Sequence, residues 1–411
     1  MNPKPFTVRA VHCDYRATDE EVYQSLKRAV DPLDRCWEKL RKAKRIAIKF
    51  NQDWSPKTVV YHQGHRQQLV SDQVARAVLR LLRERTAADL FMTDVAVEHV
   101  PENGSRADNT QLLPILREFD VPYVDGNLDE VCWVDVPGGG LMFDRYPVPK
   151  ATYQADAVIS VQKMKNHRFM GITLCLKNLF GLVPLLPRGR PRMYYHHLVR
   201  MPYMLVDLGR IFNPTLSIID GLVGQAGMEW GPGQYPRVCN TLVAGDQVVA
   251  TDACTAYLMG HDPQFDWLTP PFLRDRNALL IASQNGFGDT NLENIDFSSE
   301  VEAPVGEFFS DRLDGEETVV SWRRTTAEQG LYYRDHFREI VSRYAGQYIL
   351  LQMGQVQWSN PDGNLHVSRR VLSGEHPEQA MWLKYVDPDE SEREHFEVYE
   401  QTITDMNKKG Y

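Results

Sequence analysis

Apolar runs of strand length alternate with amphipathic segments over the first three hundred residues. Residues 45–50 form one such run after a charged helical segment at 19–42, and apolar residues recur at helical spacing after His65. Further strands are expected at 88–93, 157–161, 216–219 and 241–244. Short buried strands that alternate with helices are typical of parallel sheets. The pattern therefore predicts the α/β class, with a mostly parallel, Rossmann-like layered sheet.

The pattern changes in the last hundred or so residues. The elements expected there are strands at 318–322 and 348–353 and a helix near 331–344. The segment 387–400 carries seven acidic residues against one arginine at helix-compatible spacing, which suits a solvated helix or a docking surface for a basic partner. Two parts are expected: an α/β domain at 1–300 and a C-terminal α+β appendage at 301–411 that packs on it.

Composition excludes several classes of protein. The 411 residues have a formal net charge of −9, and no basic stripe indicates nucleic-acid binding. The six cysteines lie far apart, which excludes a local zinc ribbon or an iron-sulfur cluster within this chain and favours a reducing compartment. The amino terminus lacks the apolar stretch of a signal peptide, and no apolar run approaches 18 residues. A cytoplasmic protein without nucleic-acid or membrane partners is expected.

The strongest candidate for chemistry follows the run at 157–161. Lys163, Lys165 and His167 occupy alternate positions, and residues two apart on a strand point to the same side. We expect these three side chains to line a cleft at the carboxyl end of the strand, where ligands of open α/β sheets bind, while Met164 and Asn166 point elsewhere. If the lysines act through charge, replacing them with methionine should leave folding stability nearly unchanged, because exposed surface substitutions usually change it little.

Other strand ends add polar residues to the same edge. Lys49 and Asn51 leave one strand, Asp94 leaves the next, and Asp220 opens an apparent glycine-rich loop from Gly221 to Gly233. Asp252 is interpreted as an N-cap or first-turn acid of the helix after 241–244. The residues expected to be catalytic are Lys163, Lys165, His167, Lys177 and Asp220, and those expected to bind substrate are Lys49, Asn51, Asn178, Arg188, Arg190 and Gly231. This local excess of basic groups predicts a site for a small anion.

A divalent metal at the same place is a second interpretation. His196 and His197 could ligate it together with His167 and Glu229. Imidazole with carboxylate suits zinc, iron, nickel or manganese, so the sequence does not choose among them. The alternative is that the histidine pair belongs to an ordinary surface loop.

Several ordered motifs resemble the domain-of-unknown-function 362 family. They are IKFN at 48–51, KMKNHRFMGITLCLKNLFGL at 163–182, IIDGLVGQAGMEWGPG at 218–233, LVAGDQVVATDACTAYLMGHDP at 242–263 and NGFGD at 285–289. The resemblance covers roughly residues 40–300 and implies a prokaryotic, largely uncharacterised family whose members often carry or neighbour a ferredoxin-like module. Because this chain lacks clustered cysteines, any iron-sulfur partner would act in trans.

Three classes of function follow. The first is an enzyme acting on a small carboxylate or phosphate, with or without a metal. The second is a redox-partner or cofactor-handling protein that works with a ferredoxin-like protein, and the third is a non-catalytic binder of an anionic metabolite. The chain has no phosphate loop of the GxxxxGK[ST] type, no HExxH zinc helix and no GxSxG elbow, so the reaction is not specified.

Overall fold

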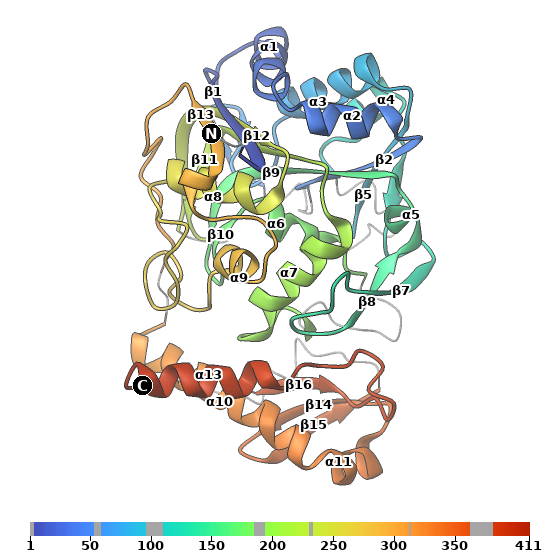
Figure 1. Ribbon diagram of the computed structural model, residues 1–411, viewed down its shortest axis with the longest axis vertical. Helices are drawn as coiled ribbons and strands as arrows, with labels where there is room; N and C mark the ends of the chain where they lie inside the picture. The colour runs from blue at the N-terminus through green and yellow to red at the C-terminus, as the bar shows by residue number, and fades with distance from the viewer. Residues whose placement is uncertain are drawn as a thin grey trace.

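A large mixed sheet organises the amino-terminal three quarters of the chain (Figure 1). The computed structural model describes residues 4–52, 59–95, 110–184, 194–229, 233–311, 314–361 and 381–411. The strand order is β13-β1-β12-β11-β9-β2-β5-β6, with β10 paired to β9. The strands are β1 (Phe6–His12), β2 (Arg45–Phe50), β5 (Asp89–Asp94), β6 (Tyr123–Asp125), β9 (Ala157–His167), β10 (Gly171–Thr173), β11 (Leu216–Gly227), β12 (Gln234–Gly245) and β13 (Ile295–Ser299).

Strand order reverses between β2 and β9. From β2 the chain moves outward through β5 to β6, then returns to the other side of β2 as β9 and continues to β11. These five strands are parallel to one another. In open α/β sheets ligands bind beyond the carboxyl ends of the strands at such a switch point. The β2–β9 junction is therefore the place where the fold favours a site.

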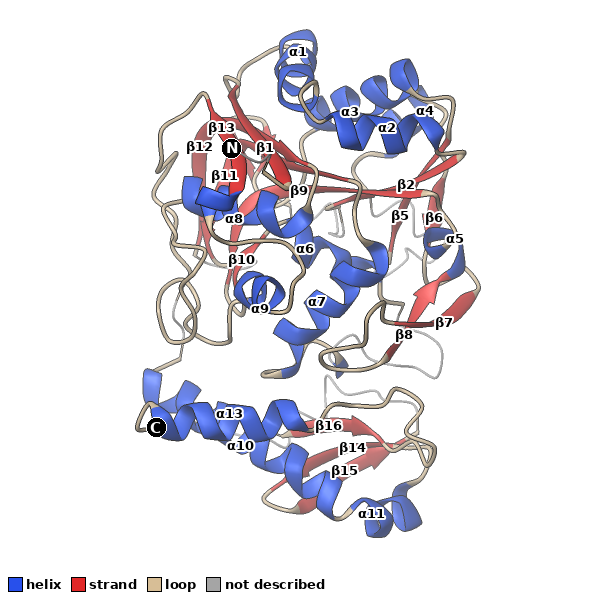
Figure 2. Cartoon of the chain, in the orientation of Figure 1, coloured by secondary structure: helices blue, strands red, loops and turns tan. Residues whose placement is uncertain are grey.

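Helices cover both faces of this sheet (Figure 2). One face carries α1 (Asp19–Val30), α2 (Asp34–Lys42) and α3 (Asp72–Arg85), whose apolar side chains pack on Ile46 and Ile48 of β2. The other face carries α6 (Cys175–Asn178), α7 (Arg200–Phe212), α8 (Val248–Leu258) and α9 (Ala278–Gln284). A capping box between Thr18 and Glu21 fixes the start of α1. The result is the layered arrangement in which parallel strands become buried on both faces.

The smaller elements lie around this sheet. Two hairpins pair β3 (Tyr61–His62) with β4 (His65–Arg66) and β7 (Val131–Asp135) with β8 (Arg145–Pro149). The short helices are α4 (Leu113–Glu118), α5 (Lys150–Tyr153), η2 (Leu179–Leu182) and η4 (Leu292–Asn294). In the part of the chain that the structure describes, no helix is both long enough and apolar enough to cross a membrane.

A second sheet, of order β15-β14-β16, builds the carboxyl-terminal part. Its elements are α10 (Glu316–Asp335), α11 (Phe337–Tyr344), β14 (Tyr348–Gln352), β15 (Gln355–Asn360), β16 (Trp382–Tyr385) and α13 (Glu397–Lys408). Arg200 of α7 is fully buried against it, with Nη2 2.9 Å from Glu394 Oε1. The hydroxyls of Tyr194 and Tyr195 donate to Glu392 at 2.8 and 2.6 Å. Buried polar contacts thus fasten this part to the main sheet.

The α/β prediction is confirmed, whereas several element boundaries are wrong. Residues 318–322 belong to helix α10, not to a strand, and 387–396 precede α13 instead of forming its first turns. The segment 19–42 is two helices, not one. The strand predicted at 157–161 continues to His167, and β11 continues to Gly227 through part of the apparent glycine loop. Lys163, Lys165 and His167 therefore all lie within strand β9.

Candidate functional site

An ion pair closes the carboxyl end of β2. Lys49 Nζ lies 2.8 Å from Asp94 Oδ2 at the end of β5 and donates a second hydrogen bond to Phe50 O at 2.9 Å. Both side chains are buried. Gly181 passes directly over the pair, since a Cβ built there would lie 2.5 Å from Lys49 Cε and 3.0 Å from Asp94 Oδ1. The pair is a sealed, neutral unit that ties two neighbouring strand ends together.

A second ion pair joins β9 to β11. The register sets Lys163 opposite Asp220, and Nζ lies 2.8 Å from Asp220 Oδ2 with both side chains at 0% exposure. Asp220 also accepts hydrogen bonds from Ser71 N at 2.7 Å, Ser71 Oγ at 2.8 Å and Leu222 N at 3.1 Å. Burial raises the pKa of Asp220, but Lys163 and Ser71 outweigh that effect and hold the pKa below its usual value. The charge of Lys163 is consequently matched inside the protein.

The two lysines meet the expectation of a common edge. Lys49 is opposite Ser160 on β9, three residues before Lys163. Three residues correspond to about 10 Å along a strand. The prediction that both lysines lie at one edge of the sheet is therefore confirmed.

Glu229, just beyond β11, brings together the remaining basic groups of β9. Its Oε1 lies 3.4 Å from Lys165 Nζ and its Oε2 lies 2.7 Å from His167 Nε2. Burial raises the pKa of Glu229, but His167, Lys165 and Lys177 outweigh it and hold the pKa well below its usual value. Lys165 and His167 are 1% exposed, while the side chain of Glu229 is 12% exposed. The carboxylate thus reaches the buried lysine and histidine from the more open side.

His167 is a neutral donor in this arrangement. Its Nδ1 accepts backbone N–H groups from Phe169 at 3.0 Å and Met170 at 3.2 Å, so the ring proton is on Nε2. Burial lowers the pKa of His167 to about 4. Nε2 nevertheless forms no well-aligned hydrogen bond, although Glu229 Oε2 is within 2.7 Å of it. His167 therefore presents a single N–H, that of Nε2, to the Glu229 carboxylate beside Lys165.

Amide side chains line the switch point itself. Asn178 Nδ2 donates to Lys49 O and Ser160 Oγ, each at 3.0 Å, and to Val161 O at 3.2 Å, which bridges β2 and β9. Asn178 Oδ1 and Asn51 Oδ1 are buried without a hydrogen-bond partner. Buried acceptors normally find a donor. The junction therefore offers acceptor oxygens next to the basic groups.

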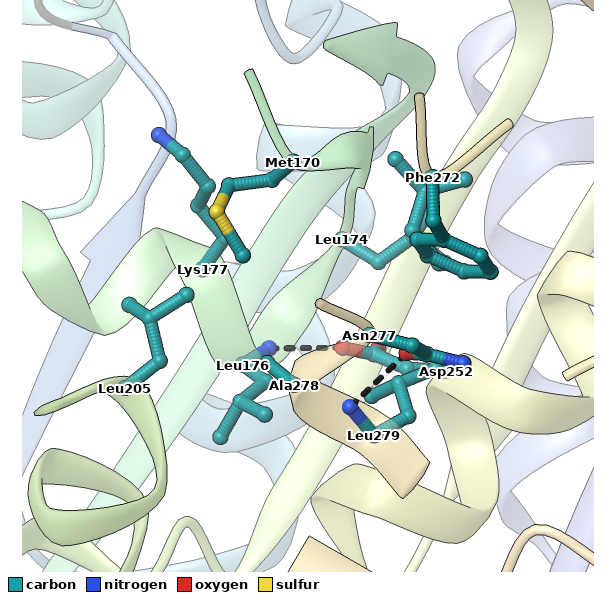
Figure 3. A pocket seen from close by; sticks show the side chains of 11 residues that line it. Met170, Leu174, Leu176, Lys177, Leu205, Asp252, Phe272, Asn277, Ala278 and Leu279 are labelled. Carbon is teal, nitrogen blue, oxygen red and sulfur yellow. Dashed lines mark hydrogen bonds between the residues drawn. The ribbon is translucent and has the colours of Figure 1, made fainter. Parts of the chain in front are cut away.

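A small pocket lies among β10 and the helices α6, α7, α8 and α9 (Figure 3). Its volume of about 20 Å³ is on the scale of a single water. Asp252 of α8 lines it and accepts the N–H groups of Cys175 at 2.9 Å and Leu176 at 2.7 Å. Burial raises the pKa of Asp252 to about 8, against the effect of these two donors. Lys177 contributes only its stem to the pocket, and Figure 3 shows its ammonium directed away from Asp252.

The alternation predicted along β9 is confirmed in part. Met164 contacts the β11 side, where a Cβ on Gly221 would lie 2.8 Å from Met164 Cε, and Asn166 donates to Gly171 O at 2.9 Å. The three basic residues, however, do not line one open cleft. All are buried, and they divide between two acids: Lys163 pairs with one, whereas Lys165 and His167 share the other.

The histidine pair separates in the structure. The ring of His196 lies 5.8 Å from that of His167, measured between centroids. The nitrogens of His197 instead face Leu198 O at 3.2 Å and Met381 O at 3.1 Å. Within the described residues, His, Cys, Asp and Glu side chains form no group of three or more suited to a metal ion. Arg188, Arg190 and Gly231 lie outside the described residues.

Sequence reasoning missed two groups at this site. Ser71 was not identified, although its place before the first acidic residue of α3 is a helix-start signal. Asp252 was predicted to cap the start of α8, which is wrong. Gln247 caps α8, and Asp252 accepts hydrogen bonds from the first amides of α6. That contact spans 77 residues of sequence. No local pattern could have revealed it.

Comparisons with known proteins agree with the motifs. A thylakoid-associated protein of Synechocystis sp. is 27% identical over 252 residues, which cover 58% of this chain and 70% of that protein. The lactate racemase apoprotein from Thermoanaerobacterium thermosaccharolyticum is a solved structure with a TM-score of 0.34 and 12% identity. It matches 56% of this chain, which spans about half (53%) of that structure. The model of the domain of unknown function DUF362 matches residues 46–257. The chain belongs to the DUF362 family.

Proposed function

We propose that the protein is an enzyme that binds a small anionic substrate beyond the carboxyl ends of β2 and β9. The switch point supplies the location, and three buried lysines, Lys49, Lys163 and Lys165, surround it. Lys49 and Lys163 are matched by Asp94 and Asp220, so the ammonium of Lys165 is the one that favours an anion there. The anion is a carboxylate or a phosphate, which are the groups that ammonium and N–H donors bind most strongly.

The observation that carries the proposal is the environment of Lys165. Lys49 and Lys163 each form a hydrogen bond of 2.8 Å with a buried carboxylate, so both are matched by the fold. Lys165 is equally buried, yet among the described residues it is paired only with Glu229, at 3.4 Å. A buried ammonium with one long contact is costly to the fold. Such a group is better explained by ligand binding than by stability.

Two chemical roles are open to Lys165. Burial is the main cause that lowers its pKa, and the like charges of Lys49 and Lys163 add to the effect. A lysine with a lowered pKa serves as a general base toward a bound substrate or as an amine nucleophile toward a carbonyl. His167, as a neutral donor, orients the anion in either case.

Calorimetric titration with a panel of small carboxylates and inorganic phosphate tests the proposal. Lys165→Met keeps the stem and removes the ammonium, and it should weaken binding by about 1.5–3 kcal/mol, the range for hydrogen bonds to charged groups. Lys150→Met is the matched control, because Lys150 pairs with Glu130 on the surface. If the wild type and the Lys165 variant bind every anion equally, the proposal is wrong.

Turnover separates an enzyme from a binding protein that uses the same site. Proton NMR of each bound ligand, followed over hours in D₂O, reports exchange at carbon or conversion to product. An enzyme using Lys165 as a base should exchange the substrate proton, and Lys165→Met should stop the exchange. Binding without any change in the ligand would favour a non-catalytic role.

A further inference from the structure

The contacts of Glu229 have the form of a carboxylate held by two donors. One oxygen lies toward Lys165 Nζ at 3.4 Å and the other toward His167 Nε2 at 2.7 Å. Lys165 and His167 therefore each face one oxygen, and together they face both oxygens of the planar carboxylate. A tetrahedral phosphate would place a third oxygen where neither of these two donors points. The pair of donors suits a carboxylate.

Glu229 fits these donors poorly. The 3.4 Å contact to Lys165 is long for a charge-assisted hydrogen bond, which is usually about 2.7–2.9 Å. The N–H of His167 is within reach of the other oxygen but is not aligned with it, and Nε2 remains without a proper hydrogen bond. Both shortfalls would be removed by a carboxylate free to rotate and to move closer. A residue selected only as a structural counter-ion would be expected to satisfy its donors, as Asp220 satisfies Lys163.

The position of His167 also argues against a catalytic pairing with Glu229. In a catalytic histidine–carboxylate pair the acid holds one ring nitrogen and the other nitrogen faces the reacting group. Here Nδ1 is taken by the backbone amides of Phe169 and Met170. Only Nε2 remains, and it is directed to the carboxylate position itself. His167 thus serves to recognise a carboxylate, not to relay a proton past it.

Glu229 is the most exposed of the three side chains at this position. The side chains of Lys165 and His167 are 1% exposed, while that of Glu229 is 12% exposed. An incoming anion would therefore meet Glu229 before the donors. Because ligand and side chain compete for one lysine and one N–H, the two cannot be bound together.

We infer that Glu229 is an internal stand-in for the substrate, that the group recognised by Lys165 and His167 is a carboxylate and not a phosphate, and that the substrate binds by displacing Glu229. This inference rests on the proposed function, since it concerns the same site. It names the substrate class as small carboxylates.

Chemical rescue of Glu229→Ala tests the shape of the position. Removing the side chain leaves Lys165 and His167 without their carboxylate, and formate or acetate can then enter in its place. The melting temperature of Glu229→Ala should rise by several degrees in 50–100 mM formate or acetate, relative to chloride at equal ionic strength. A rise of about this size is expected when a ligand is present at many times its Kd. The wild type should shift far less. The double variant Lys165→Met/Glu229→Ala, which lacks the ammonium, should lose the rescue.

Glu229→Gln tests the competition and serves if the alanine variant does not fold. The neutral amide keeps the size of the side chain but weakens its hold on Lys165, so calorimetry should show at least tenfold tighter binding of a small carboxylate such as acetate or pyruvate. Inorganic phosphate should gain much less. Equal rescue or equal gain with phosphate would overturn the carboxylate assignment, and unchanged or weaker carboxylate binding would overturn the stand-in role.

Failure of this inference is distinguishable from failure of the proposed function. If Lys165→Met abolishes anion binding while Glu229→Gln binds carboxylates no more tightly than the wild type, the anion site is supported. The role of Glu229 as a stand-in for the substrate is then refuted. If Lys165→Met leaves binding of every anion unchanged, the proposed function itself falls.

Discussion

Replacing Lys163 with methionine should destabilise the protein strongly. Two unit charges 2.8 Å apart, the distance from Lys163 Nζ to Asp220 Oδ2, attract by about 6 kcal/mol at an effective dielectric of about 20. Removal of the ammonium also removes its own cost of burial, so the net loss is smaller. Breaking a buried pair from one side typically costs about 3–5 kcal/mol. The lower end is expected here, because Asp220 keeps its hydrogen bonds from Ser71 and Leu222.

Lys165→Met is the matched control for this prediction. It makes the same substitution two residues along the same strand, at a side chain that is 1% exposed. Its ammonium has a long contact to Glu229, so its removal relieves about as much burial cost as it loses in attraction. We expect a change within about 1 kcal/mol of the wild type, close to what surface substitutions give.

Urea unfolding at pH 7, followed by circular dichroism and tryptophan fluorescence, provides the comparison. Coincident transitions from the two probes are needed before free energies are taken, because the large sheet and the β15-β14-β16 sheet could unfold separately. The double variant Lys163→Met/Asp220→Asn should cost less than the sum of its single variants, since both remove the same pair. Equal losses for Lys163→Met and Lys165→Met, or a loss below about 0.5 kcal/mol for Lys163→Met, would refute the division of roles.

Three other buried groups allow predictions. Burial raises the pKa of Asp252 in the folded protein to about 8, from the usual 3.8 of an aspartate. The wild type should therefore lose stability relative to Asp252→Asn as pH rises from about 4 to about 8, by at most about 1.4 kcal/mol per pH unit. Parallel curves of urea-derived stability against pH would contradict this. Gly181→Ala should lower thermal stability by displacing Lys49, whose Cε would lie 2.5 Å from the new Cβ. An unchanged melting temperature would show that the Lys49–Asp94 pair can move aside at little cost. Glu394→Gln should lower the free energy of unfolding by about 3–5 kcal/mol, because Arg200 is left buried without its carboxylate. Amide hydrogen exchange should then rise first in β16, and a uniform rise across the protein would argue against a local role.

The sequence predicted where the strands of the main sheet lie, though not always where they end, because short apolar runs are decided locally. Arg45–Phe50 is a strand as expected, and the basic residues of Ala157–His167 alternate as an extended chain requires. What failed was the assignment of exposure. Lysines after an apolar run suggest solvent, yet Lys163 and Lys165 are buried. The acids that permit this burial lie on other strands or beyond them, and their proximity is created only by the fold.

The glycines after Asp220 show why the rest could not be predicted. They suggested a flexible loop that cradles a ligand. In β11 they instead allow close packing within the sheet, since a Cβ on Gly224 would lie 2.6 Å from Met164 O and one on Gly221 would lie 2.8 Å from Thr241 O. Both uses of glycine give the same local sequence. Only the neighbouring strands distinguish them.

Strand β1 limits how far this chain can be cut. It lies between β12 and β13, antiparallel to one and parallel to the other, and both Phe6–His12 and Ile295–Ser299 fall outside the family-matched residues 46–257. Without them residues 241–245 of β12, which pair with β1, would present a row of unpaired amides and carbonyls. Such a row templates pairing with other chains and leads to aggregation. We therefore expect the family segment of this protein to fold poorly on its own. Anything that dislodges the first strand should make the protein insoluble before it abolishes ligand binding.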